Sequence, residues 1–559
     1  MYTTSDAYKE NQNAVYREVF YEIEYGQIDP DARDTAVIEY ISPVTIFSKP
    51  DEILNDRVIS SNVIIGTLEE DQFLLDGSRV LTPEAPPDYE VGAWGNVLSG
   101  ESGTCEFYCQ IQTTGLINAP GLTITFYQAL KQYAVDFDIV LLDGTTEVKR
   151  IEITENQDVV FETEEEITDC NRVRIEINKW SLPNYYPKIT QLDFGLYTLF
   201  NPDNLTSMFI QNKASAISES LPLSTLVFKF VNDGKYDPIF ETGRNKFVQD
   251  RQPVRSKIGS NNEQIENMYY ELSGRPNVTL GEVEVKASGL MIKFEKEQPI
   301  KWKSNVSLYS IAEEIMQECG VAKFEIDTSL NSMMVTCLIT ENYRDTLTDL
   351  LIASQCVFVQ RKDTLCIETR NLVPVDYTIT KENSKFPEIS IQDDVKKIIV
   401  YKNTYSLGAV ETLTTFTAPS TGEHILSVQN AMDISVGGGA LTYAGINFVK
   451  VNATSGTTIT VSGKPIKFVE TKHEYGSGNI AKEIKGNPFI IDPQAVSTWI
   501  LEYYLKRQDI SVEWRQDNAL ELLDTITAES DYGDINVIIE EQSFEFDGGF
   551  KGTTKGRAV

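Results

Sequence analysis

Aromatic side chains crowd two short segments that lack the alternation of a strand, and aromatic rings in loops can bind sugars. Trp180, Tyr185 and Tyr186 stand close together beside prolines in WSLPNYYPK, and Trp94 stands in YEVGAW. An aromatic ring offers a flat apolar face to sugar C–H groups, while the Tyr hydroxyl and Trp N–H can contact a hydroxyl or water. We therefore expect these four residues to form a carbohydrate-binding site. The alternative is that the rings fill the end of a core, because large aromatic side chains are buried on average.

The residues needed for enzymatic chemistry are sparse. The only two histidines, His424 and His473, are far apart, and neither lies in a nucleophile motif such as G-x-S-x-G. The 83 acidic residues could include a carboxylate pair for glycoside hydrolysis, but that chemistry depends on a spatial separation that the sequence does not reveal. We predict that the chain is not an enzyme, with a glycan-degrading enzyme as the least favoured alternative.

Metal ligands are also sparse. Cys105 and Cys109 would need a second short-spaced pair of cysteines or histidines to hold zinc, and there is none. Loop carboxylates of a β-sandwich would suit calcium, but no EF-hand-like spacing appears. Because the seven cysteines are odd in number and stand mostly beside apolar residues, we predict small buried side chains without a disulfide framework, and no cofactor. The cysteines are Cys105, Cys109, Cys170, Cys319, Cys337, Cys356 and Cys366.

The chain carries 49 basic and 83 acidic residues, a net charge of −34. Such a charge repels nucleic acid, which excludes sequence-specific nucleic-acid recognition as an expected function. It suits either a soluble surface or the acidic lining of a ring through which DNA slides. No run of about 18 apolar residues occurs, so we expect no membrane span. The opening residues lack a basic region followed by an apolar stretch, so we expect no signal peptide and assembly in a cytoplasm.

The elements that must position these residues are mostly strands. PGLTITFYQ alternates Leu122, Ile124 and Phe126 with polar residues, NRVRIEINKW alternates in the same way, and Asp143-Gly144 marks a hairpin turn. Short alternating strands with frequent turns predict a β-sandwich or jelly roll. Before it, REVFYEIEYG and DTAVIEYIS predict a hairpin with a turn at residues 29–31.

Two helical stripes interrupt the β pattern. LYSIAEEIMQECG has an apolar helical face, with Asn305 or Ser307 placed to cap it and Gly320 to end it, and RDTLTDLLIASQ has a second one. Asp492-Pro493 opens a third helix near the C-terminus. We expect a mainly β, multidomain fold. Its predicted parts are an N-terminal part of a first barrel (1–60), an inserted jelly roll (61–200), the remainder of the first barrel (201–300), a small α/β domain (301–380), a second β domain (381–490) and a C-terminal helix and β unit (491–559).

The predicted sandwich resembles the galactose-binding-like, discoidin-type jelly rolls that serve as carbohydrate-binding modules. The resemblance lies in YEVGAW, PGLTITF, DFDIVLLDG and VRIEINKWSLPNYYPKITQLDFG, about a fifth of the chain. Such folds bind sugars, lipids or proteins, so the resemblance alone names no ligand.

A second resemblance covers roughly four fifths of the chain. MYTTSDAYKE, LPLSTLVFKFVNDGKYDP, LYSIAEEIMQECGV, TLTDLLIASQCVFVQRKDTLCIETR and QSFEFDGGFKGTTKG occur in an order similar to that of bacteriophage tail-tip or baseplate hub proteins. The resemblance implies tube-like β-barrels joined to a small α/β domain. It also implies a homotrimeric ring that continues the tail tube, contacts with tube or distal tail proteins and with fibre or spike components, and a place in the virion after assembly in the bacterial cytoplasm.

We therefore expect a structural subunit of a phage tail tip, whose jelly roll contacts host-surface glycans or neighbouring tail proteins. The sequence ends soon after the glycine-rich FDGGFKG, without the peptidase or lysozyme region of longer hub proteins, which argues against direct wall degradation. A receptor-binding or fibre-type protein, in which the jelly roll is the main functional element, is the second interpretation.

Overall fold

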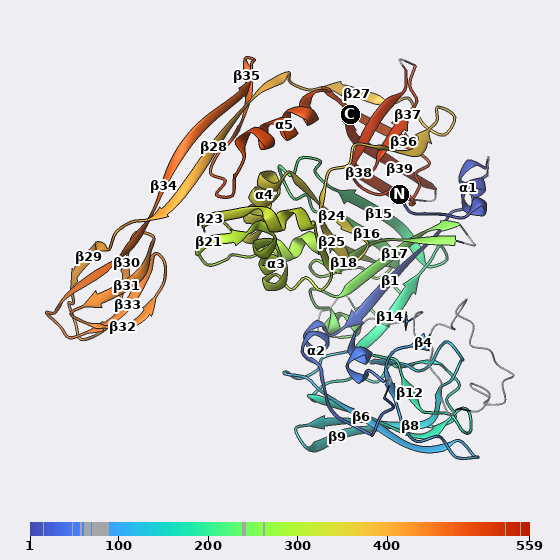
Figure 1. The fold of residues 1–559 in the computed structure, drawn as a ribbon. Coiled ribbons are helices and arrows are strands. Elements are labelled where there is room, and N and C mark those ends of the chain that lie inside the picture. The colour runs from blue at the N-terminus through green and yellow to red at the C-terminus, as the bar shows by residue number, and fades with distance from the viewer. Residues whose placement is uncertain are drawn as a thin grey trace, which may run out of the picture.

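The computed structural model describes residues 1–14, 16–46, 48–55, 59–60, 69, 89–237, 242–260, 263–531, 533–547 and 549–559. It confirms a mainly β fold built from several sheets. Figure 1 shows a central framework, a β-sandwich at the lower end of the view, and a long arm that carries a small β domain. The predicted boundary between residues 60 and 61 falls beside residues outside this description.

The framework is organised around one sheet of fourteen strands, of which eleven form a continuous antiparallel path. Strands from the first half of the chain therefore share a sheet with strands from its C-terminal end. In spatial order the path is β14 (Gly195–Phe200), β1 (Phe20–Ile28), β17 (Pro253–Ser260), β18 (Glu263–Leu272), β20 (Glu282–Gly289), β16 (Thr225–Val231), β15 (Leu205–Lys213), β38 (Ile535–Phe546), β39 (Phe550–Ala558), β36 (Gln508–Trp514) and β27 (Glu388–Ile391). The remaining strands are β19 (Asn277–Val278), β26 (Pro374–Ile379) and β37 (Thr525–Ala528).

The predicted N-terminal hairpin is wrong. β1 pairs with β14 and β17, whereas β2 (Val37–Ile41) pairs with β6 (Thr104–Gln112) in the sandwich. Residues 29–31 start helix α2 (Pro30–Thr35), because the Asp29 carboxylate accepts the amide hydrogens of Asp31 and Ala32 at 3.0 Å each and proline suits the first helical position. The short helix carries the chain out of the framework and into the sandwich.

The sandwich consists of a five-stranded and a three-stranded antiparallel sheet that share one core. Phe107, Phe137 and Ile175 project into this core from the larger sheet, and Ile124 and Leu192 from the smaller one. Burying such a side chain contributes about 1.5–3 kcal/mol. The larger sheet has the order β2, β6, β11 (Arg172–Trp180), β8 (Ala134–Asp143) and β9 (Thr146–Ile153), and the smaller one β10 (Val160–Thr163), β7 (Leu122–Thr125) and β13 (Gln191–Asp193). Two short pairs add β5 (Ala93–Trp94) with β12 (Lys188–Ile189), and β3 (Ile59–Ser60) with β4 (Tyr89–Glu90).

The chain enters and leaves the sandwich beside one pair of framework strands. The chain leaves β1 after Ile28 and returns at Gly195, which pairs with Ile28 as β14 begins. A side chain at Gly195 would meet the carbonyl oxygen of Gln27, since a Cβ there would lie 2.1 Å from that atom. The close approach of the two backbones, with a φ of 153° at Gly195, explains why glycine stands at this junction.

The predicted helices of the α/β region are confirmed. α3 (Leu308–Glu318) begins after Ser307, whose hydroxyl accepts the amide hydrogen of Ser310, and α4 (Tyr343–Ser354) begins after Asn342. Both pack into one core, which also buries Cys319, Cys337 and Cys356. The strands beside them are β21 (Lys301–Ser307) with β23 (Met334–Ile339), and β22 (Phe324–Ile326) with β25 (Thr364–Thr369) and β24 (Cys356–Arg361). Six of the seven cysteines are buried, as predicted, and Cys105 is half-buried.

The arm is a ribbon of two long antiparallel strands, β28 (Val395–Leu407) and β34 (Thr458–Gly476), with β35 (Ile480–Ile484) parallel to β28 at its base. Helix α5 (Pro493–Tyr504) begins after Asp492, as predicted, and packs against β28. We call residues 408–463 the distal domain, which lies at the end of the arm (Figure 1). Its strands are β29 (Glu411–Thr417), β30 (Gly422–Ser427), β31 (Ala431–Gly437), β32 (Ala440–Ala444) and β33 (Phe448–Ala453), with the start of β34.

The N-terminal segment lies across the framework. Helix α1 (Asp6–Asn13) begins after Ser5, and the Tyr8 hydroxyl donates a 2.8 Å hydrogen bond to Asp517. Arg17 donates to the carbonyl oxygens of Arg515 and Gln516 at 2.6 and 2.7 Å. These contacts tie the N-terminal segment to residues 515–517, which directly follow β36 of the framework. None of the helices in the described part of the chain has the length and apolar character needed to cross a bilayer.

Candidate binding sites of the sandwich

The four aromatic residues predicted to bind sugar lie mostly inside the sandwich. Trp180 is 1% exposed and packs edge-on against Phe126 at 5.9 Å, Trp94 is 3% exposed, and Tyr186 is 7% exposed. Tyr185 is half-buried and shows part of its ring at the surface. This is the placement described by the core-filling alternative, and sugar binding by these residues stays a prediction.

Two of the four rings surround a buried lysine. The Lys188 ammonium lies 4.5 Å from the centre of the Trp94 ring, 4.7 Å from Tyr127 and 5.8 Å from Tyr185. It is fully buried, forms an ion pair with Glu69 and donates to the Gln132 amide oxygen at 2.7 Å. Burial lowers the pKa of Lys188 to about 8, although Glu69 favours the charged form. The rings thus hold a cation supplied by the chain itself.

A cleft of about 480 Å³ lies away from the sandwich core, on the outer face of the five-stranded sheet. We call it the outer-face cleft. Its two exposed rings are Tyr40, 60% exposed, and Tyr108, 46% exposed. It is lined by Glu39, Tyr40, Tyr108, Gln110, Leu142, Gly144, Thr145, Arg172, Arg174 and Glu176. Strands β6, β8 and β9 of this sheet lie at the lower end of the molecule in Figure 1.

Strand register explains why these side chains share one face. Tyr40 pairs with Gln110, and Gln110 pairs with Arg174, so the three side chains form a row across β2, β6 and β11. Tyr108 points the same way because it lies two residues before Gln110. The register of β2 shifts between Ile38 and Tyr40, a β-bulge that lets Glu39 reach the cleft beside Tyr40.

Ion pairs hold the polar lining in place. Arg172 contacts both carboxylate oxygens of Glu39, at 2.6 and 3.2 Å, and Gln110 donates to Glu39 at 2.9 Å. These hydrogen bonds hold the pKa of Glu39 below its usual value. Arg174 pairs through Nε with Glu176 at 2.8 Å, and Arg150 contacts Glu176 at 2.9 Å. The lining therefore carries two arginines against two carboxylates and has no net charge.

The sequence missed this cleft. Tyr108 stands at an outward position of an alternating strand, and this position could have indicated an exposed ring. Tyr40, however, was predicted to lie in a hairpin of the framework. Only the pairing of β2 with β6 places the two rings on one face.

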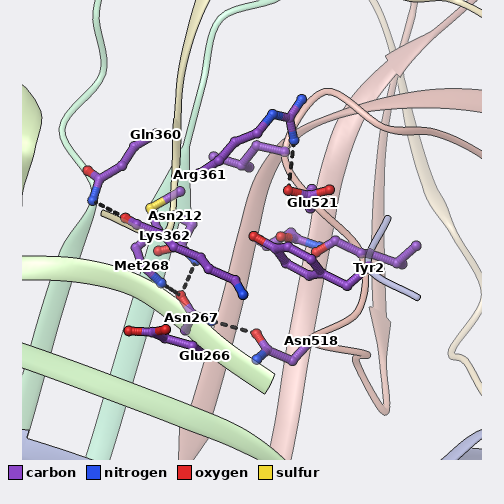
Figure 2. A pocket seen from close by; sticks show the side chains of 13 residues that line it. Tyr2, Asn212, Glu266, Asn267, Met268, Gln360, Arg361, Lys362, Asn518 and Glu521 are labelled. Carbon is purple, nitrogen blue, oxygen red and sulfur yellow. Dashed lines mark hydrogen bonds and ion pairs between the residues drawn. The ribbon is translucent and has the colours of Figure 1, made fainter. Parts of the chain in front are cut away.

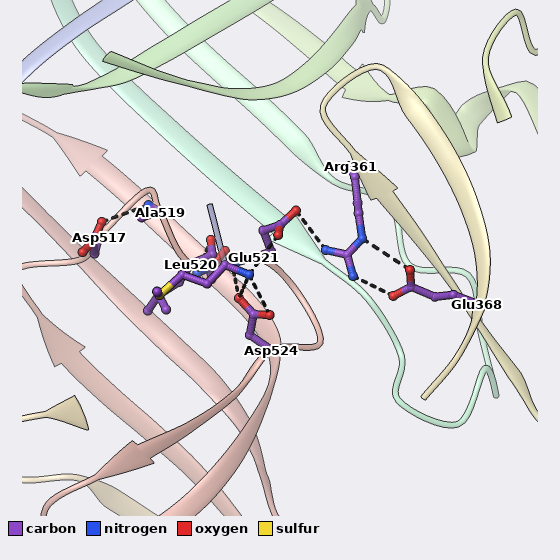
Figure 3. A network of polar contacts seen from close by, with 9 residues as sticks. Arg361, Glu368, Asp517, Ala519, Leu520, Glu521 and Asp524 are labelled. Carbon is purple, nitrogen blue, oxygen red and sulfur yellow. Dashed lines mark hydrogen bonds and ion pairs between the residues drawn. The ribbon is translucent and has the colours of Figure 1, made fainter. Parts of the chain in front are cut away.

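Polar side chains around the N-terminus form a network of ion pairs with one another and do not outline a ligand site. Arg361 contacts Glu521 at 2.9 Å and also pairs with Glu368, while the Met1 amino group contacts Glu521 and Asp524 at 3.0 and 2.8 Å (Figure 3). The neighbouring cavity measures about 30 Å³. Tyr2 lies close to Lys362 there, and Asn267 donates to Asn518 at 2.6 Å (Figure 2). That volume holds about one water molecule.

The two histidines lie apart from these sites. His424 contacts the Ser420 carbonyl oxygen at 2.9 Å, and the His473 ring stacks on Tyr475. Within the described ranges, no group of three or more His, Cys, Asp or Glu side chains is placed to hold a metal ion.

Comparison with known proteins gives structural neighbours only. No protein-family model matches the sequence, and no curated protein matches it. The prophage MuSo2 43 kDa tail protein from Shewanella oneidensis is 11% identical, with 65% of this chain and 95% of that chain covered and a TM-score of 0.40. A tail protein from Neisseria meningitidis MC58 is 8% identical over 64% and 93% of the two chains, also with a TM-score of 0.40. A chain of the phage P2 virion baseplate in its activated conformation is 7% identical over 67% and 93%, with a TM-score of 0.26.

Proposed function

We propose that this chain is a structural subunit of a bacteriophage tail tip or baseplate, a hub-like protein that forms a homotrimeric ring continuing the tail tube. One observation carries the proposal. The five segments that resemble the hub family are spread from residue 1 to residue 556, yet all of them lie in the framework or the α/β region. They form α1, β16, α3, α4 to β25, and β38 with β39. Trp499 packs against the cores of both regions and joins them.

The arm supports assembly with a second copy of the chain. Residues 401–407 of β28 pair with residues 466–472 of β34, and no third strand of the described chain flanks them. Tyr405 anchors one side of the ribbon near Trp302, at 6.5 Å between ring centres. Phe468 and Val469 are nevertheless 57% and 68% exposed. Because a two-stranded ribbon is marginally stable in water, a covering partner would stabilise it.

Charge supports the same assignment. Residues 393–487 contain nine lysines and eight carboxylates, so they carry +1 while the rest of the chain carries −35. Two acidic bodies repel one another, whereas a nearly neutral arm with exposed apolar side chains can approach an acidic neighbour without that repulsion. An arm that reaches the next subunit in this way would close a ring.

The test combines solution mass with labelled imaging. We expect a trimer of the purified chain, alone or with a tail-tube protein as template, and we expect label on this chain to appear at the tail tip of the particle. Phe468→Asp with Val469→Asp should leave a folded monomer, whereas Val148→Asp, an exposed apolar position on β9, should leave the trimer intact. A chain that stays monomeric with the tube protein present, or label found away from the tail, would contradict the proposal.

A receptor-binding or fibre-type protein is the second candidate. The outer-face cleft belongs to the sheet of β6, β8 and β9, which lie at the lower end of the molecule in Figure 1, and this position favours contact between the sandwich and another surface. In the tail-tip role the same sandwich would touch host glycans or buttress neighbouring tail, fibre or spike proteins. In neither role is the chain proposed to be an enzyme.

A further inference from the structure

We propose that the outer-face cleft binds an uncharged glycan segment laid across β2 and β6. This inference names the ligand of a site that the proposed tail-tip role does not require. It rests on the lining of the cleft, and it can hold or fail independently of where the chain sits in a particle.

The two tyrosines form the apolar part of the site. Tyr40 and Tyr108 stand on neighbouring strands as diagonal neighbours, and both rings are largely exposed. Neither ring stacks on another aromatic or cationic group among the described residues. Exposed rings on a rigid sheet suit a ligand with flat C–H faces, because the rings can pack on it while their hydroxyls stay wet.

Arg174 supplies the polar part. Its Nε lies 2.8 Å from Glu176 as an ion pair without the geometry of a hydrogen bond, and its two terminal amino groups have no hydrogen-bond partner among the described residues. The guanidinium therefore offers its four terminal N–H donors in the cleft, in a plane that suits neighbouring hydroxyl oxygens. A ligand rich in hydroxyl groups matches these donors and the tyrosine rings together.

The charge of the site selects an uncharged ligand. Glu39 and Glu176 neutralise Arg172 and Arg174, so the lining attracts neither cations nor anions strongly. The net charge of −34 opposes the approach of a polyanion such as an acidic polysaccharide. The volume of the cleft, about 480 Å³, also falls within the range of about 300–1,000 Å³ found for ligand sites.

Affinity electrophoresis of the full chain tests the inference, with soluble neutral polysaccharides (a glucan, a galactan and a mannan) and the polyanion polygalacturonate as probes. We expect retardation by at least one neutral probe, at low and at high salt alike. Tyr40→Ala, Tyr108→Ala and Arg174→Gln should each weaken it by about tenfold or more, whereas Tyr40→Phe, which keeps the ring, should retain most of it. Tyr443→Ala, at an exposed tyrosine of the distal domain, serves as the matched control, and thermal melting should show that every variant folds.

Several results would overturn the inference. These are no retardation by any neutral probe, retardation by polygalacturonate alone, or loss of binding with Tyr185→Ala but not with Tyr40→Ala. The third result would move the site to the loop predicted from the sequence. Capture of a tail protein by the same face, abolished by Tyr40→Ala in the absence of glycan binding, would replace the ligand by a protein. The tail-tip proposal would survive each of them.

Discussion

Lys188 and Glu69 form an ion pair inside the sandwich, where aromatic rings replace the water around the ammonium. The attraction between such a pair is offset by the cost of removing both charges from water, so the pair is weak evidence of stability. Removing one partner is costly, because the remaining charge stays buried without its counter-ion.

We predict that Lys188→Met destabilises the sandwich by about 3–5 kcal/mol, since it removes the cation beside the buried Glu69 carboxylate, to which the Tyr186 amide still donates at 3.0 Å. Urea unfolding followed by tryptophan fluorescence measures the change, because Trp94 and Trp180 report on the sandwich. Lys188→Met combined with Glu69→Gln is the control, and it should recover a large part of the loss. Equal destabilisation by the single and double variants would show that packing, not charge, determines the effect.

Asp349 on α4 carries a pH-dependent part of the stability. Burial, together with the nearby charges of Glu341 and Asp345, raises the pKa of its carboxyl group to about 7. Because the folded-state pKa lies above the value of about 4 of an unfolded aspartate, the stability from this group is complete below pH 4 and is lost as the pH rises towards 7.

We therefore predict that Asp349→Asn stabilises the chain at pH 8 by about 1–3 kcal/mol and changes little at pH 4. Thermal melting at the two pH values measures the difference. Glu341→Gln should make the loss of stability smaller and end it at lower pH, because removing a nearby negative charge lowers the Asp349 pKa towards its usual value and reduces the penalty at neutral pH. An equal gain from Asp349→Asn at both pH values would show that the effect does not arise from ionisation.

At the scale of elements, local signals in the sequence predicted local structure well. The caps at Ser307 and Asp492 and the alternation of β11 all depend on residues close together in the chain, and the structure confirms them. The pairing of β2 with β6 was missed because it joins residues about 70 positions apart, and alternation fixes which face a side chain takes but not which strand lies beside it. Because that pairing was missed, the sequence did not predict that Tyr40 and Glu39 line the cleft.

The junction at Gly195 tests how the sandwich is attached. Gly195→Ala would place a methyl group against the Gln27 carbonyl oxygen, so we expect β14 to separate from β1 at this end and the stability to fall by about 2 kcal/mol or more. Gly115→Ala is the control, since nothing lies within 4 Å of a Cβ there. Hydrogen exchange at Tyr197 and Leu196 measures the opening. Unchanged protection at both residues would contradict the role given to the glycine.

At the scale of the whole molecule, the uneven distribution of charge has a consequence for assembly. The acidic bodies of neighbouring copies repel one another, and added salt screens that repulsion over about 8–10 Å at moderate ionic strength. We predict that self-association of the chain strengthens as salt rises, as measured by sedimentation. The variant with Phe468→Asp and Val469→Asp should stay monomeric throughout, and association that weakens with salt would point to ion pairs as the main contact.

The attachment of the sandwich also determines how the molecule bears mechanical load. Both tethers emerge at the same end of the β1 and β14 pair, so a pull on the sandwich moves the two strands together and does not peel one from the other. Part of the force passes to the ladder between β1 and β17, where it acts along the strands and strains many hydrogen bonds at once. A particle held to a surface through this sandwich would be tethered by a shear-resistant joint.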